Sequence, residues 1–419
     1  MIKNSEKLTE ARAIPKQFKH DNNKLLLGGL SLTNIELLLG STPYYAYDKQ
    51  IITEKVASLK AALPSDITLH YAIKANPYQP IVNLLAQQVS GFDVASKKEM
   101  LLALQTGMPA NNISFAGPGK TIADISAAII AGVTLHVESP TEISRVANTA
   151  QQLSLRANIA IRVNPEFELK HSGMKMSGGA KPFGIDEEAL PELIPQLPFE
   201  HINLRGFHIY SGSQNLNADA ILSTQQQTLS LATKLITLAQ QYNPTKIDYI
   251  NMGGGLGIPY FKNEKPLDIE YLGNQLTTVL KSFKSKFADV EVILELGRYL
   301  VGDAGIYVTK VIDKKVSRGT SYLVCDGGLH HHLANSGNFG QVIRKNYPVA
   351  IGNKLAGDER EQVSIVGPLC TPLDILADKV TLPTATIDDY VVVFQSGAYG
   401  ASASPKDFLS QPELKEVLL

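Results

Sequence analysis

Short apolar runs rich in β-forming residues alternate with longer stretches of helical periodicity between about residue 51 and residue 298. This alternation is typical of repeated βα units, whose strands form a parallel sheet. The expected strands are residues 67–75, 91–96, 112–118, 134–140, 159–165, 203–213, 246–255 and 290–298. Because eight strands close a (β/α)8 barrel, the pattern predicts a TIM-like barrel over 51–298, with a doubly wound sheet as the alternative.

The pattern changes after residue 298, where strand-like runs follow one another with turn residues and little helical periodicity between them. These runs are residues 305–315, 320–328, 361–370 and 389–397, and "GSTPYYAYD" (40–48) is strand-like as well. We therefore expect an antiparallel β-sandwich or barrel domain built from 24–50 and 299–419. Residues 1–23 are expected to form an N-terminal extension.

Composition narrows the class of partner. The net charge of −1 argues against nucleic acid or a charged membrane surface as a partner. The N-terminus lacks the apolar core of a signal peptide, and no apolar run approaches the length of a transmembrane helix. The two cysteines, Cys325 and Cys370, are too few for a disulfide framework. We expect a cytoplasmic protein that acts on a small molecule or on another protein.

Unusual polar residues gather at the ends of the expected barrel strands, where the working residues of such barrels lie. A single charged residue there is most simply a solvated cap, but so many together indicate a site. They are Lys74, Asp93, Arg162, His208, Glu295 and Arg298, together with the glycines at 253–255.

The glycine run "MGGGLG" (252–257) follows the seventh expected strand, where barrels of this kind usually bind phosphate. A phosphate there and a lysine at the end of the first strand suggest a phosphorylated aldehyde held through a Schiff base, which means pyridoxal phosphate. That cofactor needs a carboxylate at its pyridine nitrogen, and Glu295 is the candidate. The alternative for Glu295 is a salt bridge to Arg298.

These residues resemble the pyridoxal-phosphate-dependent decarboxylases of the ornithine/diaminopimelate decarboxylase family, which have fold type III. The resemblance runs from "TPYYAYD" to "GAYG" and includes "YAIKAN", "GFDVASKKEM", "IRVNP", "GFHIYSGSQ", "ELGR" and "GPLC". It implies an alanine-racemase-like barrel with a β domain, and a Schiff base on Lys74. The implied contacts to the cofactor are Lys74, Asp93, Arg162, Ser213, Gly253, Gly254, Gly255, Glu295, Gly297, Arg298 and Tyr399.

Two aromatic candidates compete for the role of covering the cofactor ring. The stacking histidine of the family aligns with Tyr210, whereas His208 lies two residues earlier on the same strand face. The resemblance also assigns Cys370 as a catalytic residue beside Lys74. Since this cysteine comes from the partner subunit in the family, the resemblance implies a homodimer with shared active sites.

The residues that would contact the substrate differ from those of the best-known members of the family. An acidic residue that pairs with the distal amine of the substrate usually follows the cysteine, but this chain has Thr371. A hydroxyl cannot compensate a buried ammonium as a carboxylate can. The motifs resemble instead a side branch from exosortase, polysaccharide and other biosynthetic clusters, one member of which acts on a carrier-bound glutamyl group. We expect an L- or D-amino acid that is diaminopimelate-like, acylated or carrier-bound, contacted by Arg298, Thr371 and Tyr399.

Other functions stay open at this point. A racemase of the same fold would also use a lysine Schiff base, and a decarboxylase-like binding protein would lack catalysis altogether. The run His330–His332 suggests a metal site, but consecutive residues of a strand point to opposite sides, and we expect no bound metal.

Overall fold

The structure is a computed structural model that describes residues 14–170, 173–339 and 344–419. Its contacts divide the chain into a barrel unit, Lys55–Pro259 with Lys265–Leu300, and a β unit, Met1–Glu54 with Tyr260–Glu264 and Val301–Leu419. The expected domain boundaries at residues 24, 51 and 299 stay a prediction. Part of the expected N-terminal extension, residues 1–13, lies outside the described residues.

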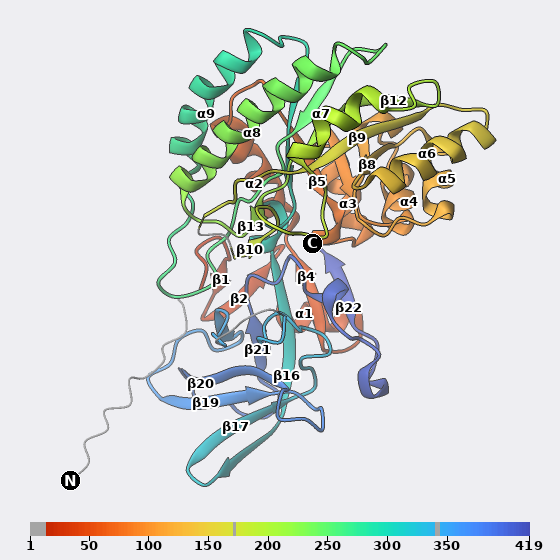
Figure 1. Cartoon of the computed structure of the whole chain (residues 1–419). Helices are drawn as coiled ribbons and strands as arrows, with labels where there is room; N and C mark the ends of the chain where they lie inside the picture. The colour runs from red at the N-terminus through yellow and green to blue at the C-terminus, as the bar shows by residue number, and fades with distance from the viewer. Residues whose placement is uncertain (1–13, 171–172, 340–343) are drawn as a thin grey trace. The chain divides into compact units, whose positions relative to one another are not determined.

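Eight parallel strands form a closed barrel (Figure 1). The ring is closed because β15 pairs with β5 and β8 pairs with β9. Each strand overlaps one that the sequence pattern predicts, so the predicted eight-stranded barrel is confirmed. The strands are β5 (Ile67–Ala72), β6 (Gly91–Val94), β7 (Ile113–Phe115), β8 (Thr134–Val137), β9 (Ala157–Asn164), β12 (Ile202–His208), β14 (Tyr249–Asn251) and β15 (Glu291–Leu296).

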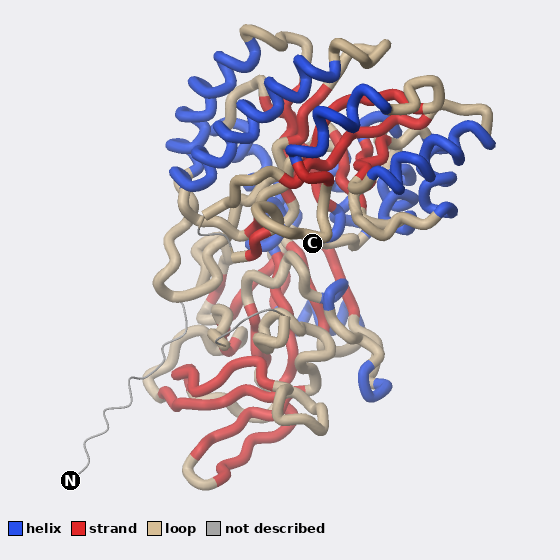
Figure 2. The backbone as a smooth tube through the Cα atoms, in the orientation of Figure 1, coloured by secondary structure: helices blue, strands red, loops and turns tan. Residues whose placement is uncertain are grey.

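Helices follow most of the barrel strands, and Figure 2 shows that most helices of the chain gather around these strands. They are α2 (Lys49–Ala62), α3 (Gln79–Ala86), α4 (Lys97–Gln105), α5 (Ile122–Ala131), α6 (Pro140–Gln152), α7 (Leu190–Leu193), α8 (Ala218–Ala239), α9 (Ile269–Lys284) and α10 (Arg298–Val301). Several begin at a side chain that accepts a backbone N–H, as Ser96, Thr121 and Ser139 do for α4, α5 and α6. No described helix is both long and apolar enough to cross a membrane.

The interior of the barrel is polar over much of its length, although such interiors are usually filled with branched apolar side chains. One apolar cluster of described residues joins Ala160, Tyr249 and Ile293. Elsewhere the barrel strands carry buried polar groups, among them His70, Asp93, Ser114, His136, Arg162, His208, Asn251 and Glu295. Burial of these groups is costly unless they are paired, so their pairing is the first question that the site raises.

The β unit contains a sheet in the order β18 (Val349–Ile351), β21 (Tyr390–Val393), β16 (Gly305–Ser317), β17 (Thr320–Cys325), β19 (Arg360–Val366) and β20 (Ile375–Pro383), and β4 (Tyr44–Tyr47) pairs with β16 and β22 (Lys415–Leu418). The predicted separate β domain is confirmed, but its sheet is mixed rather than wholly antiparallel. β17 pairs with β19 in parallel, and β22 pairs with β4 in parallel. Alternation along a strand does not reveal the direction of its neighbour, which long connections set.

Smaller strands complete the described chain: β1 (His20–Asp21), β2 (Lys24–Leu27), β3 (Leu30–Ser31), β10 (Met174–Lys175), β11 (Ile185–Asp186) and β13 (Gly212–Ser213). β1 to β3 precede α1 (Leu32–Leu39) in the β unit. Phe18, within the expected extension, is buried there and packs on Phe394 with ring centroids 5.2 Å apart. This short segment before β1 thus contributes to the core of the β unit.

Candidate active site

Lys74 lies in a single 3-10 turn, Ile73–Ala75, that directly follows β5. The preceding strand is buried on both faces, and the chain turns where Asn76 accepts the backbone N–H of Tyr78 at 3.0 Å. The Tyr71 hydroxyl donates to the Asn76 carbonyl at 2.9 Å and ties the turn to the strand. The turn therefore places a lysine that is about one-third exposed at the carboxyl ends of the strands.

The ammonium of Lys74 lies between two buried carboxyl groups from neighbouring strands. Its Nζ is 3.2 Å from Oε1 of Glu295 on β15 and 3.4 Å from Oδ2 of Asp93 on β6. The side chains of Glu295 and Asp93 are almost wholly buried, at 1% and 0% exposure. Two carboxyl groups that share one cation cannot both ionise cheaply in such a site, so they are expected to differ in charge.

The two carboxyl groups do differ in pKa. Burial raises the pKa of Asp93 well above its usual range, and the negative charge of Glu295 adds to this effect. Burial also disfavours the charged form of Glu295, but the Lys74 ammonium and His208 outweigh it and hold the pKa of Glu295 well below its usual range. The site thus holds one carboxylate, one neutral carboxyl and one ammonium at neutral pH.

A column of buried side chains supports Glu295 from inside the barrel. His208 Nε2 lies 3.2 Å from Oε2 of Glu295, and Asn251 donates to the same oxygen at 3.4 Å. The His136 ring lies 4.4 Å from the His208 ring between centroids, and its Nε2 is 3.0 Å from the Tyr249 hydroxyl. His208 is thereby occupied beneath Glu295 and is 2% exposed.

Tyr210, by contrast, is half-buried and faces the lysine, with its ring centroid 5.5 Å from Lys74 Nζ. Of the two aromatic candidates, Tyr210 is thus the one beside the reactive amine.

The glycine segment lies against the backbone of Glu295. The N–H of Gly253 donates to Asn251 Oδ1 at 2.8 Å, and a Cβ on Gly254 would lie 2.1 Å from the Glu295 carbonyl oxygen. Gly253 and Gly255 have positive φ angles of 64° and 90°, which side chains rarely adopt. Only glycine therefore lets the backbone approach this closely.

Other predicted residues lie near this segment. The segment with Ser213 runs beside it, since the Asn215 N–H donates to the Gly255 carbonyl at 2.9 Å. Gly297 packs on the turn of Lys74, where a Cβ would lie 2.8 Å from Ala75 Cβ.

The two arginines have different surroundings. Arg162 on β9 is held by Glu138, with NH1 3.0 Å from Oε1, and is buried. Glu138 also accepts the Gly117 N–H at 2.7 Å, so the arginine is anchored to a neighbouring loop of the barrel. Arg298 begins α10 and is half-buried. Glu295 pairs with Lys74 at 3.2 Å, and its salt bridge to Arg298 stays an alternative.

The remaining predicted residues lie in the β unit. Cys370 is exposed and shares the loop after β19 with Thr371, whereas Cys325 is buried. Tyr399 follows β21 and has a φ of 53°, a strained value for a side chain of its size. The three histidines at 330–332 are buried, and no group of metal-ligating side chains is found in the described part of the chain.

Comparison with known proteins identifies the family. A sequence model described as "Pyridoxal-dependent decarboxylase, pyridoxal binding domain" matches residues 49–302. The chain belongs to this family. It is a pyridoxal-phosphate-dependent amino acid decarboxylase, and the matched residues include Lys74 and Glu295.

Relatives of the decarboxylase cover nearly its whole length. It is 35% identical to the "L-glutamyl-[BtrI acyl-carrier protein] decarboxylase" of Niallia circulans, over 90% of this chain and 88% of the relative. It is 30% identical to the "2-[(L-alanin-3-ylcarbamoyl)methyl]-2-hydroxybutanedioate decarboxylase" of Staphylococcus aureus, over 90% of this chain and 94% of the relative. The solved diaminopimelate decarboxylase of Methanocaldococcus jannaschii is similar in structure, with a TM-score of 0.84 and 26% identity over 96% of this chain and 92% of that one.

The residues of this decarboxylase fit pyridoxal phosphate by the chemistry of their donor groups. One cluster contains an amine for the aldehyde and an ionised carboxylate for the pyridine nitrogen. It also contains a glycine segment whose backbone is packed too closely for a side chain. The family assignment and the cluster therefore agree.

Sequence reasoning missed several residues that hold this cluster. Asn251 supports both Glu295 and Gly253, Ser114 donates to Asp93 Oδ1 at 3.1 Å, and His136 lies under His208. Glu138, which holds Arg162, was also missed. A polar residue inside a buried strand is the one signal that could have found them, because such a residue is costly without a partner.

The opposite pKa shifts of Glu295 and Asp93 predict opposite effects on the stability of the cofactor-free decarboxylase. Glu295→Gln is expected to lose about 3 kcal/mol of unfolding free energy at neutral pH, since Lys74 and His208 lose their anion. Because the folded pKa of Glu295 is lowered, this loss shrinks as pH falls below 4.5, when the wild-type carboxylate is protonated too.

Asp93→Asn is the matched comparison. The folded pKa of Asp93 is raised, so the wild type loses stability as pH rises above 3.8 and the variant does not. We expect the variant to be more stable at neutral pH by about 1 kcal/mol or more, with no advantage at low pH. Urea unfolding of the wild type and both variants between acid and neutral pH measures these differences. If both substitutions changed the unfolding free energy in the same direction at neutral pH, the charge assignment would be contradicted.

Proposed function

We propose that the protein decarboxylates, at Cα, an amino acid whose distal end is neutral, acylated or carrier-bound, with Lys74 as the residue that binds pyridoxal phosphate covalently. The observation that carries this proposal is the position of Lys74 Nζ, 3.2 Å from Glu295 and 3.4 Å from Asp93 beside the ring of Tyr210. An amine in this place is held by its charge in the resting protein and needs to lose only one proton to become a nucleophile.

Each residue of the cluster has a proposed task. When bound, pyridoxal phosphate supplies an electron sink for the pair that remains on Cα after the carboxylate departs as carbon dioxide. Glu295 holds a proton at the pyridine nitrogen, and His208 and Asn251 keep that carboxylate ionised and in place. Tyr210 supplies the aromatic face that covers the ring.

The phosphate is proposed to bind to the backbone N–H groups of Gly253, Gly254 and Gly255 and to the Ser213 hydroxyl. Asp93, Arg162, Gly297 and Arg298 complete the proposed surroundings of the cofactor.

Cys370 is proposed to deliver the proton that Cα receives, and Tyr399 to contact cofactor and substrate. The exposure of Cys370 supports this role, since a proton donor to a substrate must be accessible. We propose further that the protein is a homodimer in which Cys370 of one subunit serves the lysine of the other. The resemblance of "GPLC" to the family motif supports that arrangement.

The substrate assignment rests on Thr371 and on the relatives. Thr371 stands where the family usually has an acidic residue, and its Oγ1 accepts the Leu373 N–H at 3.3 Å. The two relatives with the highest identities reported above carry names that specify a carrier-bound glutamyl group and an amide-linked alanine derivative. Neither named substrate presents a free distal ammonium, which agrees with a neutral Thr371.

Borohydride reduction tests the proposed cofactor lysine. The protein is loaded with pyridoxal phosphate, reduced and digested, and the pyridoxyl adduct is located by mass spectrometry. We expect one adduct on Lys74, none in Lys74→Arg, which keeps the charge, and an unchanged adduct in Lys60→Arg, an exposed lysine of α2. An adduct on another lysine in the wild-type protein would refute the assignment.

Mixing two inactive variants tests the shared site. Lys74→Arg and Cys370→Ala are each expected to release little carbon dioxide. Co-refolding them is expected to restore about a quarter of wild-type activity, because half of the dimers are mixed and each mixed dimer has one intact site. Activity that stays at the level of the separate variants, in dimers shown to be mixed, would mean that lysine and cysteine come from the same subunit.

A substrate panel tests the role of Thr371. Carbon dioxide release is compared for lysine, ornithine, meso-diaminopimelate, Nε-acetyl-lysine and glutamate loaded on a carrier protein. We expect an acylated or carrier-bound substrate to react at least about tenfold faster than any free diamino acid, and Thr371→Asp to narrow that ratio. Rapid turnover of free lysine or ornithine by the wild type would refute the argument from Thr371.

A further inference from the structure

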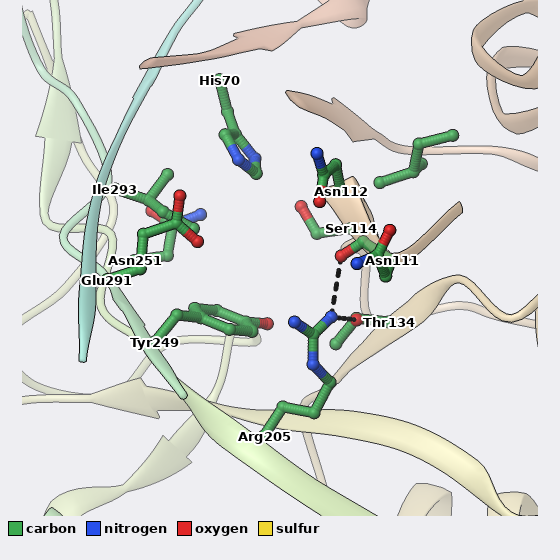
Figure 3. A pocket seen from close by; sticks show the side chains of 11 residues that line it. His70, Asn111, Asn112, Ser114, Thr134, Arg205, Tyr249, Asn251, Glu291 and Ile293 are labelled. Carbon is green, nitrogen blue, oxygen red and sulfur yellow. Dashed lines mark hydrogen bonds between the residues drawn. The ribbon is translucent and has the colours of Figure 1, made fainter. Parts of the chain in front are cut away.

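A pocket lined by side chains of the barrel strands is shown in Figure 3. It lies at the amino-terminal ends of the strands, since Thr134, Tyr249 and Glu291 are the first residues of β8, β14 and β15. Its mouth lies beside Asn111 and Glu291, which are exposed, and its lining is mainly polar. We call it the basal pocket.

The basal pocket is suited to water. Arg205 reaches into it and donates to the Asn111 carbonyl at 2.8 Å and to the Thr134 hydroxyl at 2.6 Å, while Asp248 neutralises its charge (Figure 3). His70 is 5% exposed, and its Nδ1 has no hydrogen-bond partner among the residues that the structure describes. Polar cavities with unsatisfied buried groups are the ones in which proteins hold ordered water.

Two side chains that line the pocket also bond the carboxyl groups beside Lys74. Asn251 donates to Glu295, and the Ser114 hydroxyl donates to Oδ1 of Asp93 at 3.1 Å. The other oxygen of Asp93 is 3.4 Å from Lys74 Nζ. Ser114 and Asp93 thus join the pocket to the lysine in two short steps. Of the two lining residues we take Ser114 as the relay, because a hydroxyl can take up one proton while it gives up another. The Asn251 amide is already used on both sides, since it donates to Glu295 and accepts the Gly253 N–H.

The chemistry of the site requires protons to move. When the bond between Cα and the carboxylate breaks, carbon dioxide leaves without the bonding electron pair, and one proton from solvent joins Cα. Each turnover therefore consumes one proton. The Lys74 ammonium would likewise have to release one proton before its nitrogen could bind the aldehyde of pyridoxal phosphate.

We propose that the basal pocket is a water-filled proton path to Lys74, with Ser114 as the relay. In one direction, water gives a proton to Ser114 Oγ, the hydroxyl proton passes to Asp93 Oδ1, and the proton on Asp93 Oδ2 passes to Lys74 Nζ. The reverse sequence carries a proton from the Lys74 ammonium to water. Each step breaks one bond to hydrogen and forms one, so no charge stays on Ser114. The inference rests on the proposed role of Lys74.

The surroundings of Asp93 suit this task. Burial and the neighbouring Glu295 raise the pKa of Asp93, so the carboxyl carries the proton that a relay needs. Lys74 faces it from the turn after β5, Glu295 from β15 and Ser114 from β7. A proton path from the base of the barrel also does not compete for space with cofactor and substrate, which would bind at the carboxyl ends of the strands.

The rate at which the cofactor-free protein binds pyridoxal phosphate tests the relay. Ser114→Ala removes the hydroxyl, Ser114→Thr keeps it, and Thr134→Val removes another hydroxyl of the same pocket that is bonded to Arg205. Association and dissociation rates are measured by stopped-flow absorbance in H2O and D2O. We expect Ser114→Ala to slow both rates at least about tenfold. The dissociation constant should stay the same, because a relay speeds both directions equally.

Ser114→Thr is expected to restore wild-type rates within about twofold, and Thr134→Val to leave them unchanged. A wild-type association rate in Ser114→Ala, or a Ser114→Thr variant as slow as Ser114→Ala, would overturn the relay. So would a dissociation constant that changes together with the association rate, since that result indicates a structural role. A different result would refute the proposed function itself, namely an adduct on a lysine other than Lys74 in the borohydride experiment.

Discussion

One ammonium held between two buried carboxyl groups is the interaction on which the rest of this site depends. Lys74 comes from the turn after the first strand of the barrel, and Asp93 and Glu295 come from its second and last strands. Lys74 and Glu295 are 221 residues apart in the chain. They meet because β15 pairs with β5 and closes the ring. Closure of the barrel therefore creates the charge arrangement, and the ionic contacts offset part of the cost of burying these groups.

The polar interior of the barrel follows from that constraint. An ionised Glu295 in an apolar interior would be unstable, so the strands beneath it carry His208, Asn251 and His136 in place of branched apolar side chains. With His208 engaged below the carboxylate, the side chain two residues later, Tyr210, is the one that faces the lysine.

In the β unit, a buried carboxyl group holds two loops together through hydrogen bonds to their backbone N–H groups. The carboxyl group of Asp374 accepts the Leu369 N–H at 2.9 Å and the Leu329 N–H at 2.6 Å. It thereby joins the loop of Cys370 to the turn that precedes the three histidines. A Cβ on Gly328 would lie 2.2 Å from Asp374 Oδ1, and a Cβ on Gly367 would lie 2.3 Å from Asp374 Oδ2. Both positions therefore favour glycine. The three histidines at 330–332 thus belong to a buried turn that Asp374 helps to organise.

The sequence by itself determined the order and number of the barrel strands, the lysine at the end of the first strand and the glycine segment, because each depends on local periodicity or on a short motif. It did not determine the 3-10 turn that holds Lys74. It also showed that Thr371 and Tyr210 depart from the family pattern. Only the tertiary structure decided which carboxyl groups share Lys74, that His208 lies beneath Glu295, and that Ser114 links Asp93 to the basal pocket. It also decided that the β sheet is mixed. These features depend on which distant strands become neighbours and on the charge that a buried group can keep, and neither is encoded in a local pattern.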